Sequence, residues 1–260
     1  MHEQNCDRDP TRRFSSRVAD YVRYRPAYPA EIIGALRGAG VLRPGSEVAD
    51  VGSGTGLLSR LFLAAGYAVR GIEPNPDMRR AGEEQLREFA QFTSIDGTAE
   101  ATTLAKKSVD VVTAGQAFHW FDREKTKLEF QRILQADSRW VVLVWNERRV
   151  GATAFLEAYE ELLREFSTDY AAVDHRQMTP EILAAFYAPG SCQMKSFGNQ
   201  QIFDLAGVRG RLLSSSYAPG PGHPRHEAMV GELARIFEKH QENGRVVFEY
   251  DTEVYFGELS

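Results

Sequence analysis

The chain has 260 residues, of which 43% are hydrophobic and 26% charged, a composition typical of a globular protein that buries a substantial core. Its formal net charge of −5 excludes a uniformly positive surface and argues against binding to a long phosphate backbone. Cys6 and Cys192 lie in no Cys-x-x-Cys pair and near no histidine cluster with metal-ligand spacing, so we expect a reducing compartment and no metal.

The distribution of apolar residues along the chain also predicts a soluble, cytoplasmic protein. Residues 1–10 contain no apolar run that could act as a signal peptide, and no 18-residue apolar stretch follows. We therefore expect a small-molecule substrate, with neither a nucleic acid nor a membrane as partner. The sequence does not indicate an oligomeric state.

Residues 1–44 are predicted to form a helical leader that is richer in arginine than the rest of the chain. Within it, Tyr21-Val-Arg-Tyr-Arg-Pro-Ala-Tyr-Pro29 places three tyrosines around Arg25. One interpretation is a helix followed by a proline-punctuated turn that covers the edge of the core. The other is a lid over a bound ligand, with Arg25 available to an anionic group.

From residue 44 onward, short apolar runs alternate with helical segments, which is typical of βαβ units and a mainly parallel sheet. The predicted strands are 47–51, 68–72, 92–96, 109–114, 140–145, 193–203 and 245–256. The predicted helices are 57–65, 77–89, 123–134, 152–166, 180–187 and 226–240. The expected divisions are the leader (1–44), a cofactor-binding α/β core (45–147), a helical cap insertion (148–192), and a C-terminal part that completes the sheet and the substrate side (193–260).

The segment Gly52-Ser-Gly-Thr-Gly56 follows a predicted strand and opens a predicted helix. Glycines at such a turn let the backbone approach a ligand closely. A dinucleotide fingerprint requires Gly-x-Gly-x-x-Gly, but here the third glycine comes one residue early and Leu57 occupies the dehydrogenase position. A nicotinamide-dependent oxidoreductase is therefore the less favoured alternative.

Glu73 ends the second predicted strand, 17 residues after Gly56. A carboxylate at this edge of the sheet can accept hydrogen bonds from both hydroxyls of a ribose. The succession of strand, glycine loop, helix, strand and acid predicts a nucleoside site with Glu73 on the ribose.

With Asp50 two positions before Gly52, the segment Val48-Ala-Asp-Val-Gly-Ser-Gly-Thr-Gly56 resembles the first motif of the class I S-adenosylmethionine methyltransferases. The resemblance implies a Rossmann-like, doubly wound, mainly parallel sheet with an antiparallel final strand. It implies S-adenosylmethionine as cofactor and S-adenosylhomocysteine as product. It also implies that Asp50 and the loop border the methionine part, while Glu73 binds the ribose and Met78 packs near the adenosine.

Two further segments extend the resemblance over residues 14–146. Asp96-Gly-Thr-Ala-Glu100 is similar to the family segment that lines the adenine, although alone it would be read as a polar turn. Gln116-Ala-Phe-His-Trp-Phe121 is similar to the segment beside the transferred methyl. Together with the tyrosine-rich leader, it resembles the trans-aconitate-type (methyltransferase type 11) small-molecule subgroup. The turn Leu134-Gln-Ala-Asp-Ser-Arg139 departs from the family by lacking Pro-Gly-Gly, but it touches no cofactor position.

The candidate residues follow from these segments. The predicted cofactor-binding residues are Tyr21, Asp50, Gly52, Ser53, Gly54, Thr55, Gly56, Glu73, Pro74, Met78, Thr98, Ala99, Glu100 and Gln116. The predicted substrate-binding residues are Tyr24, Arg25, Tyr28, His119, Trp120 and Tyr217. Arg148, Arg149 and Arg211 are further substrate candidates from the cap side, although arginines of unknown environment are most often solvated surface charges.

His119 is the one candidate for proton transfer, because its side chain titrates in the useful range. The favoured interpretation is instead a pocket-wall residue beside Trp120, and no residue is assigned as catalytic. Phe118 and Phe121 are read as core aromatics, while Trp120 could border the sulfonium by cation–π attraction.

The predicted function is in-line methyl transfer to a small-molecule acceptor, with a carboxylate as one candidate. A carboxylate is ionised near pH 7 and needs no general base, whereas a hydroxyl or carbon acid needs one. A non-catalytic S-adenosylmethionine-binding module stays open, because the motifs indicate binding and not turnover. A nucleic-acid methyltransferase is disfavoured, because Gly115-Gln-Ala-Phe118 stands where an Asn/Asp-Pro-Pro-Tyr motif is expected.

Overall fold

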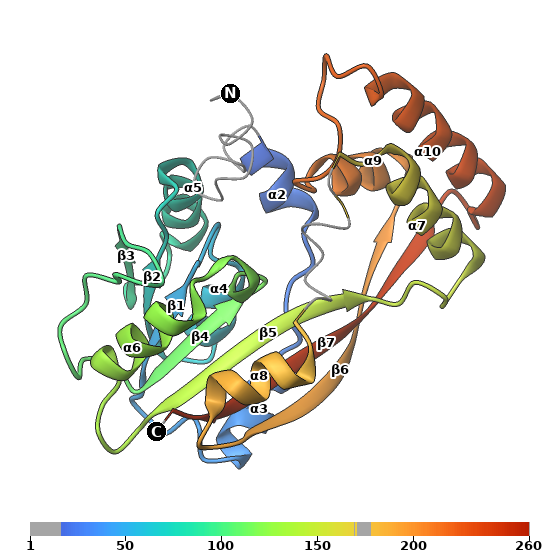
Figure 1. Cartoon of the computed structure of the whole chain (residues 1–260). Helices are drawn as coiled ribbons and strands as arrows, with labels where there is room; N and C mark the ends of the chain where they lie inside the picture. Colours follow the sequence, from blue (N-terminus) through green and yellow to red (C-terminus); the bar gives the residue numbers. More distant parts are fainter. Residues whose placement is uncertain (1–16, 169, 171–177, 260) are drawn as a thin grey trace.

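A mixed β-sheet organises the chain, of which the computed structural model describes residues 17–168, 170 and 178–259 (Figure 1). The strand order is β3-β2-β1-β4-β5-β7-β6. The first five strands pair in parallel, whereas β7 runs antiparallel to both β5 and β6. This confirms the predicted Rossmann-like sheet with an antiparallel final strand. The strands are β1 (Glu47–Val51), β2 (Ala68–Ile72), β3 (Phe92–Ile95), β4 (Val111–Gly115), β5 (Trp140–Arg148), β6 (Cys192–Phe203) and β7 (Val246–Glu258).

Helices cover both faces of the parallel part of the sheet. Successive strand residues point to opposite faces, and in these strands both faces carry apolar side chains that the helices bury. On one face, the side chains of Val48 and Val111 pack against a first set of three helices. On the other face, the side chains of Ala49 and Val112 pack against a second set of two helices. The first set is α3 (Glu31–Gly38), α4 (Leu57–Ala64) and α5 (Pro76–Leu86), and the second is α6 (Arg123–Ile133) and α8 (Pro180–Tyr187).

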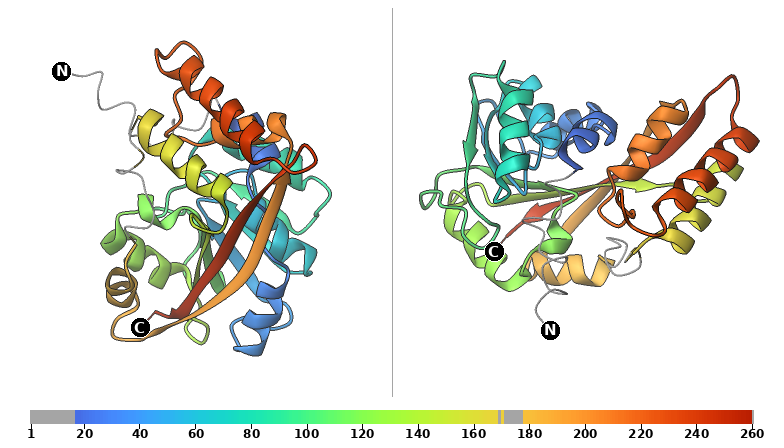
Figure 2. Two further views of the ribbon diagram at one scale, coloured as in Figure 1. Left: turned by 90° about the vertical axis from the view of Figure 1, so that its right-hand side faces the viewer. Right: turned by 90° about the horizontal axis from the view of Figure 1, so that it is seen from above.

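A second group of helices packs on the far ends of β6 and β7, as Figures 1 and 2 show. It comprises α7 (Ala154–Phe166), α9 (Leu205–Leu213) and α10 (His226–His240). Phe248 of β7 lies at the centre of this cluster, with its ring centroid 5.0 Å from that of Tyr159 and 5.4 Å from that of Phe155. We call α7, α9 and α10 the outer helices. The sequence did not predict α9.

The two helices of the expected cap at 148–192 do not pack together. The apolar side chains of α7 pack on α10 and β7, whereas those of α8 pack on the core helix α6 and on Phe118. The rings of Phe118 and Phe186 lie 4.7 Å apart. Residues 169 and 171–177 of this segment lie outside the described residues.

The described part of the leader crosses between the core and the outer helices. Residues 1–16 lie outside the described residues, and α2 (Val18–Tyr24) contacts both α5 and α9 (Figure 1). The Tyr24 ring fills the space that a Cβ would need at Gly210 of α9. Arg17 donates to the carbonyls of Leu213 at 3.1 Å and Ala218 at 2.7 Å. The leader is therefore fixed to the outer helices at one end and to the core at the other.

Among the residues that the structure describes, none of the helices combines the length and the apolarity that a membrane crossing requires.

Candidate active site

The glycine loop lies at the carboxyl ends of the parallel strands, as predicted. The N–H groups of Gly52 and Ser53 donate to the carbonyl of Ile72, at 2.8 and 3.0 Å, which ties the loop to β2. Gly52 and Gly56 have φ angles of +69° and +83°, in the left-handed region that favours glycine. A Cβ at Gly52 would also lie 2.7 Å from that of Ala117. The loop can therefore approach the segment after β4 only with glycine at this position.

A cavity opens between this loop and the segments that follow β2, β3 and β4. We call it the loop cavity. Ten of the fourteen predicted cofactor residues line it, because the carboxyl ends of parallel strands meet at one edge of a sheet. These ten are Tyr21, Gly52, Gly54, Glu73, Pro74, Met78, Thr98, Ala99, Glu100 and Gln116. Gly115, Ala117, Trp120 and Phe121 complete the lining.

Glu73 joins the glycine loop to the start of α5. One carboxylate oxygen accepts the N–H of Gly54 at 2.9 Å, and the other accepts the N–H of Asn75 at 2.8 Å. Asn75 in turn caps α5 by accepting the N–H groups of Asp77 and Met78. Burial raises the pKa of Glu73, while these backbone hydrogen bonds oppose the shift. Each carboxylate oxygen keeps acceptor capacity for a second hydrogen bond, as ribose hydroxyls require.

Four predicted cofactor residues are not in the lining of the loop cavity, namely Asp50, Ser53, Thr55 and Gly56. Asp50 is fully buried, and its Oδ2 accepts the hydroxyl of Ser59 at 2.6 Å. Its Oδ1 has no hydrogen-bond partner among the described residues. Burial raises the pKa of Asp50 to about 7. The full burial of Asp50 near the end of β1 explains why it does not line the cavity.

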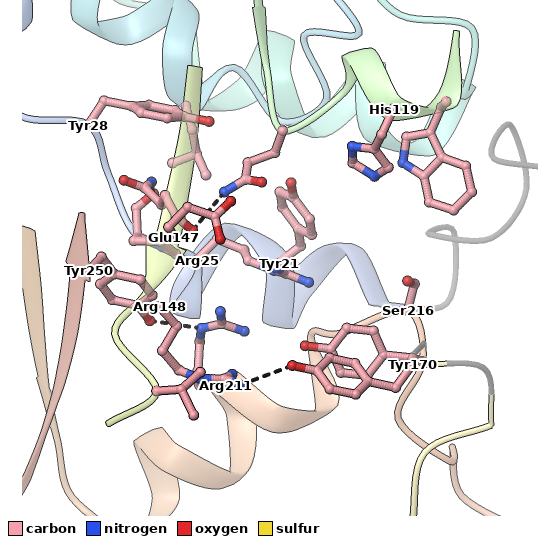
Figure 3. Close-up of a pocket in the computed structure, with 17 residues that line it drawn as sticks. Tyr21, Arg25, Tyr28, His119, Glu147, Arg148, Tyr170, Arg211, Ser216 and Tyr250 are labelled. Carbon is pink, nitrogen blue, oxygen red and sulfur yellow. Dashed lines mark hydrogen bonds between the residues drawn. The ribbon is translucent and has the colours of Figure 1, made fainter. Parts of the chain in front are cut away.

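A second cavity lies between the core, α2 and the outer helices (Figure 3). We call it the arginine cavity, because Arg25, Arg148 and Arg211 all line it. The remaining lining residues are Tyr21, Pro26, Tyr28, Leu57, Gln116, His119, Trp120, Asn146, Glu147, Val150, Tyr170, Ser216, Tyr217 and Tyr250.

Tyr21, Gln116 and Trp120 line both cavities, so the two cavities adjoin at these residues. Gln116 has a φ of +54°, which is rare for a residue with a side chain and is stabilised only by specific surroundings. Its N–H donates to the carbonyl of Val144 at 2.9 Å, and its Nε2 donates to that of Asn146 at 3.2 Å. The backbone strain therefore lies where the two cavities meet.

Most of the predicted substrate residues meet in the arginine cavity. Arg25, Tyr28, His119, Trp120 and Tyr217 all line it, and the ring centroids of His119 and Trp120 lie 5.0 Å apart. Tyr24 does not line it, because its ring packs against α9 and Phe203 instead.

The three cap-side arginines have different environments. Arg149 is exposed and pairs with Asp251, as expected for a surface charge. The surface expectation is wrong for Arg211, which is 6% exposed, and for Arg148, whose side chain is 10% exposed. Pairing of β5 with β7 carries Arg148 inward, opposite Tyr250.

Several residues that line the arginine cavity were not predicted from the sequence. Asn146, Glu147 and Tyr250 come from β5 and β7, in strands whose sequence indicates only β-structure. Asn146 accepts hydrogen bonds from Thr252 at 2.5 Å and Asn199 at 3.1 Å and so bridges three strands. No local pattern marks these residues, because their common position depends on strand register. Phe121, read as core, lines the loop cavity, while Phe118 is fully buried as predicted.

No group of three or more His, Cys, Asp or Glu side chains within the described ranges is arranged to hold a metal ion.

Comparison with known proteins relates this site to one family. Residues 49–142 match the model of a family described as a methyltransferase domain. An uncharacterized methyltransferase of Mycobacterium tuberculosis is 38% identical over 141 residues, which are 54% of this chain and 55% of that protein. An uncharacterized methyltransferase of Schizosaccharomyces pombe is 28% identical over 155 residues, 59% of this chain and 60% of that protein. The chain thus spans little more than half the length of these curated relatives.

Solved structures share the fold over most of the chain. A structure from Anaeromyxobacter dehalogenans, described as a type II methyltransferase, has a TM-score of 0.62 at 20% identity and covers 90% of this chain and 97% of its own. A structure from Anabaena variabilis, described as a methyltransferase from an antibiotic biosynthesis pathway, has a TM-score of 0.58 at 22% identity, with coverages of 88% and 98%. At these identities the likeness supports the fold.

Proposed function

We propose that this chain transfers a methyl group from S-adenosylmethionine in the loop cavity to a small molecule in the arginine cavity. The match of residues 49–142 to the methyltransferase-domain family supports the proposal. The observation that carries this proposal is that the two cavities adjoin at Tyr21, Gln116 and Trp120, which line both. Two ligands in the two cavities would meet beside these residues, and a direct transfer between them requires such a meeting point.

The residues of the loop cavity fit S-adenosylmethionine. The glycine loop leaves room for an extended ligand, Glu73 keeps acceptor capacity for ribose hydroxyls, and the side chain of Met78 offers an apolar surface for an adenine ring. When bound, S-adenosylmethionine supplies an activated methyl group on a sulfonium. Trp120 and Phe121 would exclude water from that end and place aromatic rings beside a positive charge.

The chain's contribution to the rate is then to hold the acceptor in line with the methyl, as positioning alone can supply several kcal/mol. A carboxylate acceptor fits this site with the fewest assumptions, since it needs no general base. In that case His119 acts as a wall of the arginine cavity beside Trp120.

Replacement of Glu73 tests the donor site. Glu73→Gln keeps the size of the side chain but removes its charge, so the charged hydrogen bonds to a ribose are lost. We expect a fall in affinity for S-adenosylmethionine of about 10- to 100-fold, equivalent to ~1.5–3 kcal/mol. Isothermal titration calorimetry measures it, with Glu83→Gln, an exposed residue on α5, as the matched control. Unchanged affinity in Glu73→Gln contradicts the donor site.

Turnover is tested with methyl-labelled S-adenosylmethionine and a panel of small carboxylic acids, phenols and amines. Transfer of label to at least one acceptor, with loss of transfer in Glu73→Gln at limiting cofactor, is the expected result. A parallel titration with NAD should give no binding. Tight binding of S-adenosylmethionine without transfer to any acceptor class would support the non-catalytic binding module instead.

A further inference from the structure

The arginine cavity contains more positive than negative charge. Arg25, Arg148 and Arg211 line it, and Glu147 is the only carboxylate among its described lining residues. A second carboxylate, that of the buried Glu160, does not line the cavity but forms an ion pair with Nη2 of Arg148. Counting both carboxylates, these three arginines keep one positive charge in excess.

Arg25 and Arg211 differ from Arg148 in the nature of their partners. Arg25 donates from Nη2 to the carbonyl of Ser214 at 3.0 Å, and Arg211 donates to the hydroxyls of Tyr250 at 3.3 Å and Ser215 at 3.2 Å. All of these acceptors are neutral. Within the described part of the chain, neither arginine forms an ion pair with a carboxylate, including the nearby Glu147.

The two guanidinium groups line the same cavity. Burial lowers the pKa of Arg25, and the positive charge of Arg211 lowers it further. The Nε of Arg25 is buried without a hydrogen-bond partner among the described residues. A guanidinium has five N–H donors, so both arginines keep donors beyond those that the neutral partners accept. Buried like charges with unused donors destabilise a fold unless something of opposite charge binds between them.

We propose that the methyl acceptor carries a second, non-reacting oxyanion group, a carboxylate or a phosphate, which binds between Arg25 and Arg211. The proposal rests on the proposed function, because it assigns the substrate of the same cavity. Figure 3 shows His119 at one end of the cavity and Arg211 at the other, with Arg25 between them. The guanidinium of Arg25 lies 4.9 Å from the ring centroid of Tyr21, which lines both cavities. The anchored group therefore lies on the Arg211 side of Arg25, and the accepting atom lies toward Tyr21 and Trp120.

The two arginines come from elements that assemble this subsite. Arg25 follows α2 directly, and Arg211 lies in the last turn of α9, against which α2 packs. A ligand anion between them would bind the leader to the outer helices. Arginine suits this role because its planar donors match the oxygens of carboxylates and phosphates.

Anion binding in the presence of S-adenosylhomocysteine tests the subsite. Succinate and inorganic phosphate are titrated calorimetrically into the wild type and into Arg25→Met and Arg211→Met, with succinamide as the uncharged probe. Arg149→Met, which removes an exposed arginine outside the cavity, is the matched control. We expect one of the two anions to bind at least tenfold more tightly than succinamide, and each cavity variant to lose at least tenfold in that affinity.

The stronger of the two anions identifies the ligand class. Equal affinity for succinate, phosphate and succinamide in the wild type overturns the proposal, as does undiminished anion binding in Arg25→Met. If Arg211→Met does not fold, Arg25→Met decides, because Arg25 lies beyond the end of a short surface-docked helix. Titration with S-adenosylhomocysteine alone separates the proposed function from the oxyanion subsite. Absence of S-adenosylhomocysteine binding contradicts the proposed function, whereas normal binding of S-adenosylhomocysteine without anion binding contradicts only the subsite between Arg25 and Arg211.

Discussion

Raising the pH from about 4 to about 7 should lower the free energy of unfolding through Asp50 by on the order of 4 kcal/mol. Asp50 is fully buried near the end of β1, and burial raises its pKa from 3.8 to about 7. The hydrogen bond from Ser59 opposes the shift without cancelling it. The folded state therefore binds the Asp50 proton more tightly than the unfolded state does.

The sign follows from linkage. The stabilising contribution of protonated Asp50 is fully present below about pH 4, where both states hold the proton, and it is lost as the pH rises through about 7. Above that pH the carboxylate is ionised in a fully buried position, which destabilises the fold.

Asp50→Asn should remove this slope, because the amide keeps the shape of the side chain and does not ionise. Urea unfolding at several pH values from 4 to 8 measures it, and the variant should gain stability over the wild type most clearly at pH 8. Asp137→Asn, which replaces an exposed aspartate, is the control and should keep the wild-type slope. The same slope in Asp50→Asn as in the wild type contradicts the assignment.

Glu160→Gln should destabilise the fold by about 3–5 kcal/mol, because it leaves Arg148 as an uncompensated buried charge. Glu160 is 1% exposed, and it accepts the hydroxyl of Tyr170 at 2.8 Å as well as pairing with Arg148. Arg25 and Arg211 line the same cavity, so the loss of this carboxylate also increases the repulsion among the three arginines.

The double variant Arg148→Met with Glu160→Leu should recover most of that stability, because replacing both members of a buried pair with apolar side chains is often neutral. Denaturant unfolding of Arg148→Met, Glu160→Leu and the double variant gives the coupling energy. The exposed pair of Arg149 and Asp251 is the matched control, and its coupling should stay below about 1 kcal/mol. If Glu160→Gln costs no more than disruption of this surface pair, the buried charge is compensated by another group.

Much of the loop cavity could be predicted from sequence because its parts follow one another along the chain. Glu73 comes directly after β2, Met78 lies in the first turn of the helix that follows, and the carboxyl ends of parallel strands meet at one edge. The exception is Asp50, where family resemblance indicates a position near the ligand but only the packed structure shows a fully buried side chain.

The arginine cavity could not be predicted in the same way. Arg148 and Tyr250 face each other only because β5 and β7 pair in one antiparallel register, 102 residues apart in sequence. Arg211 lies on a helix that the sequence did not predict, and it is buried by the leader and by β7. From residue type alone, Arg148 and Arg211 were expected to be solvated surface charges.

The βαβ core, the glycine loop between Val48 and Gly56, and the acid on the next strand could thus be predicted from sequence, because local periodicity and turn chemistry specify them. Packing in three dimensions sets which arginines are buried, which carboxylate compensates Arg148, and at which residues the two cavities adjoin. Those properties depend on distances between segments far apart in the chain, and such distances are set by strand register and helix packing.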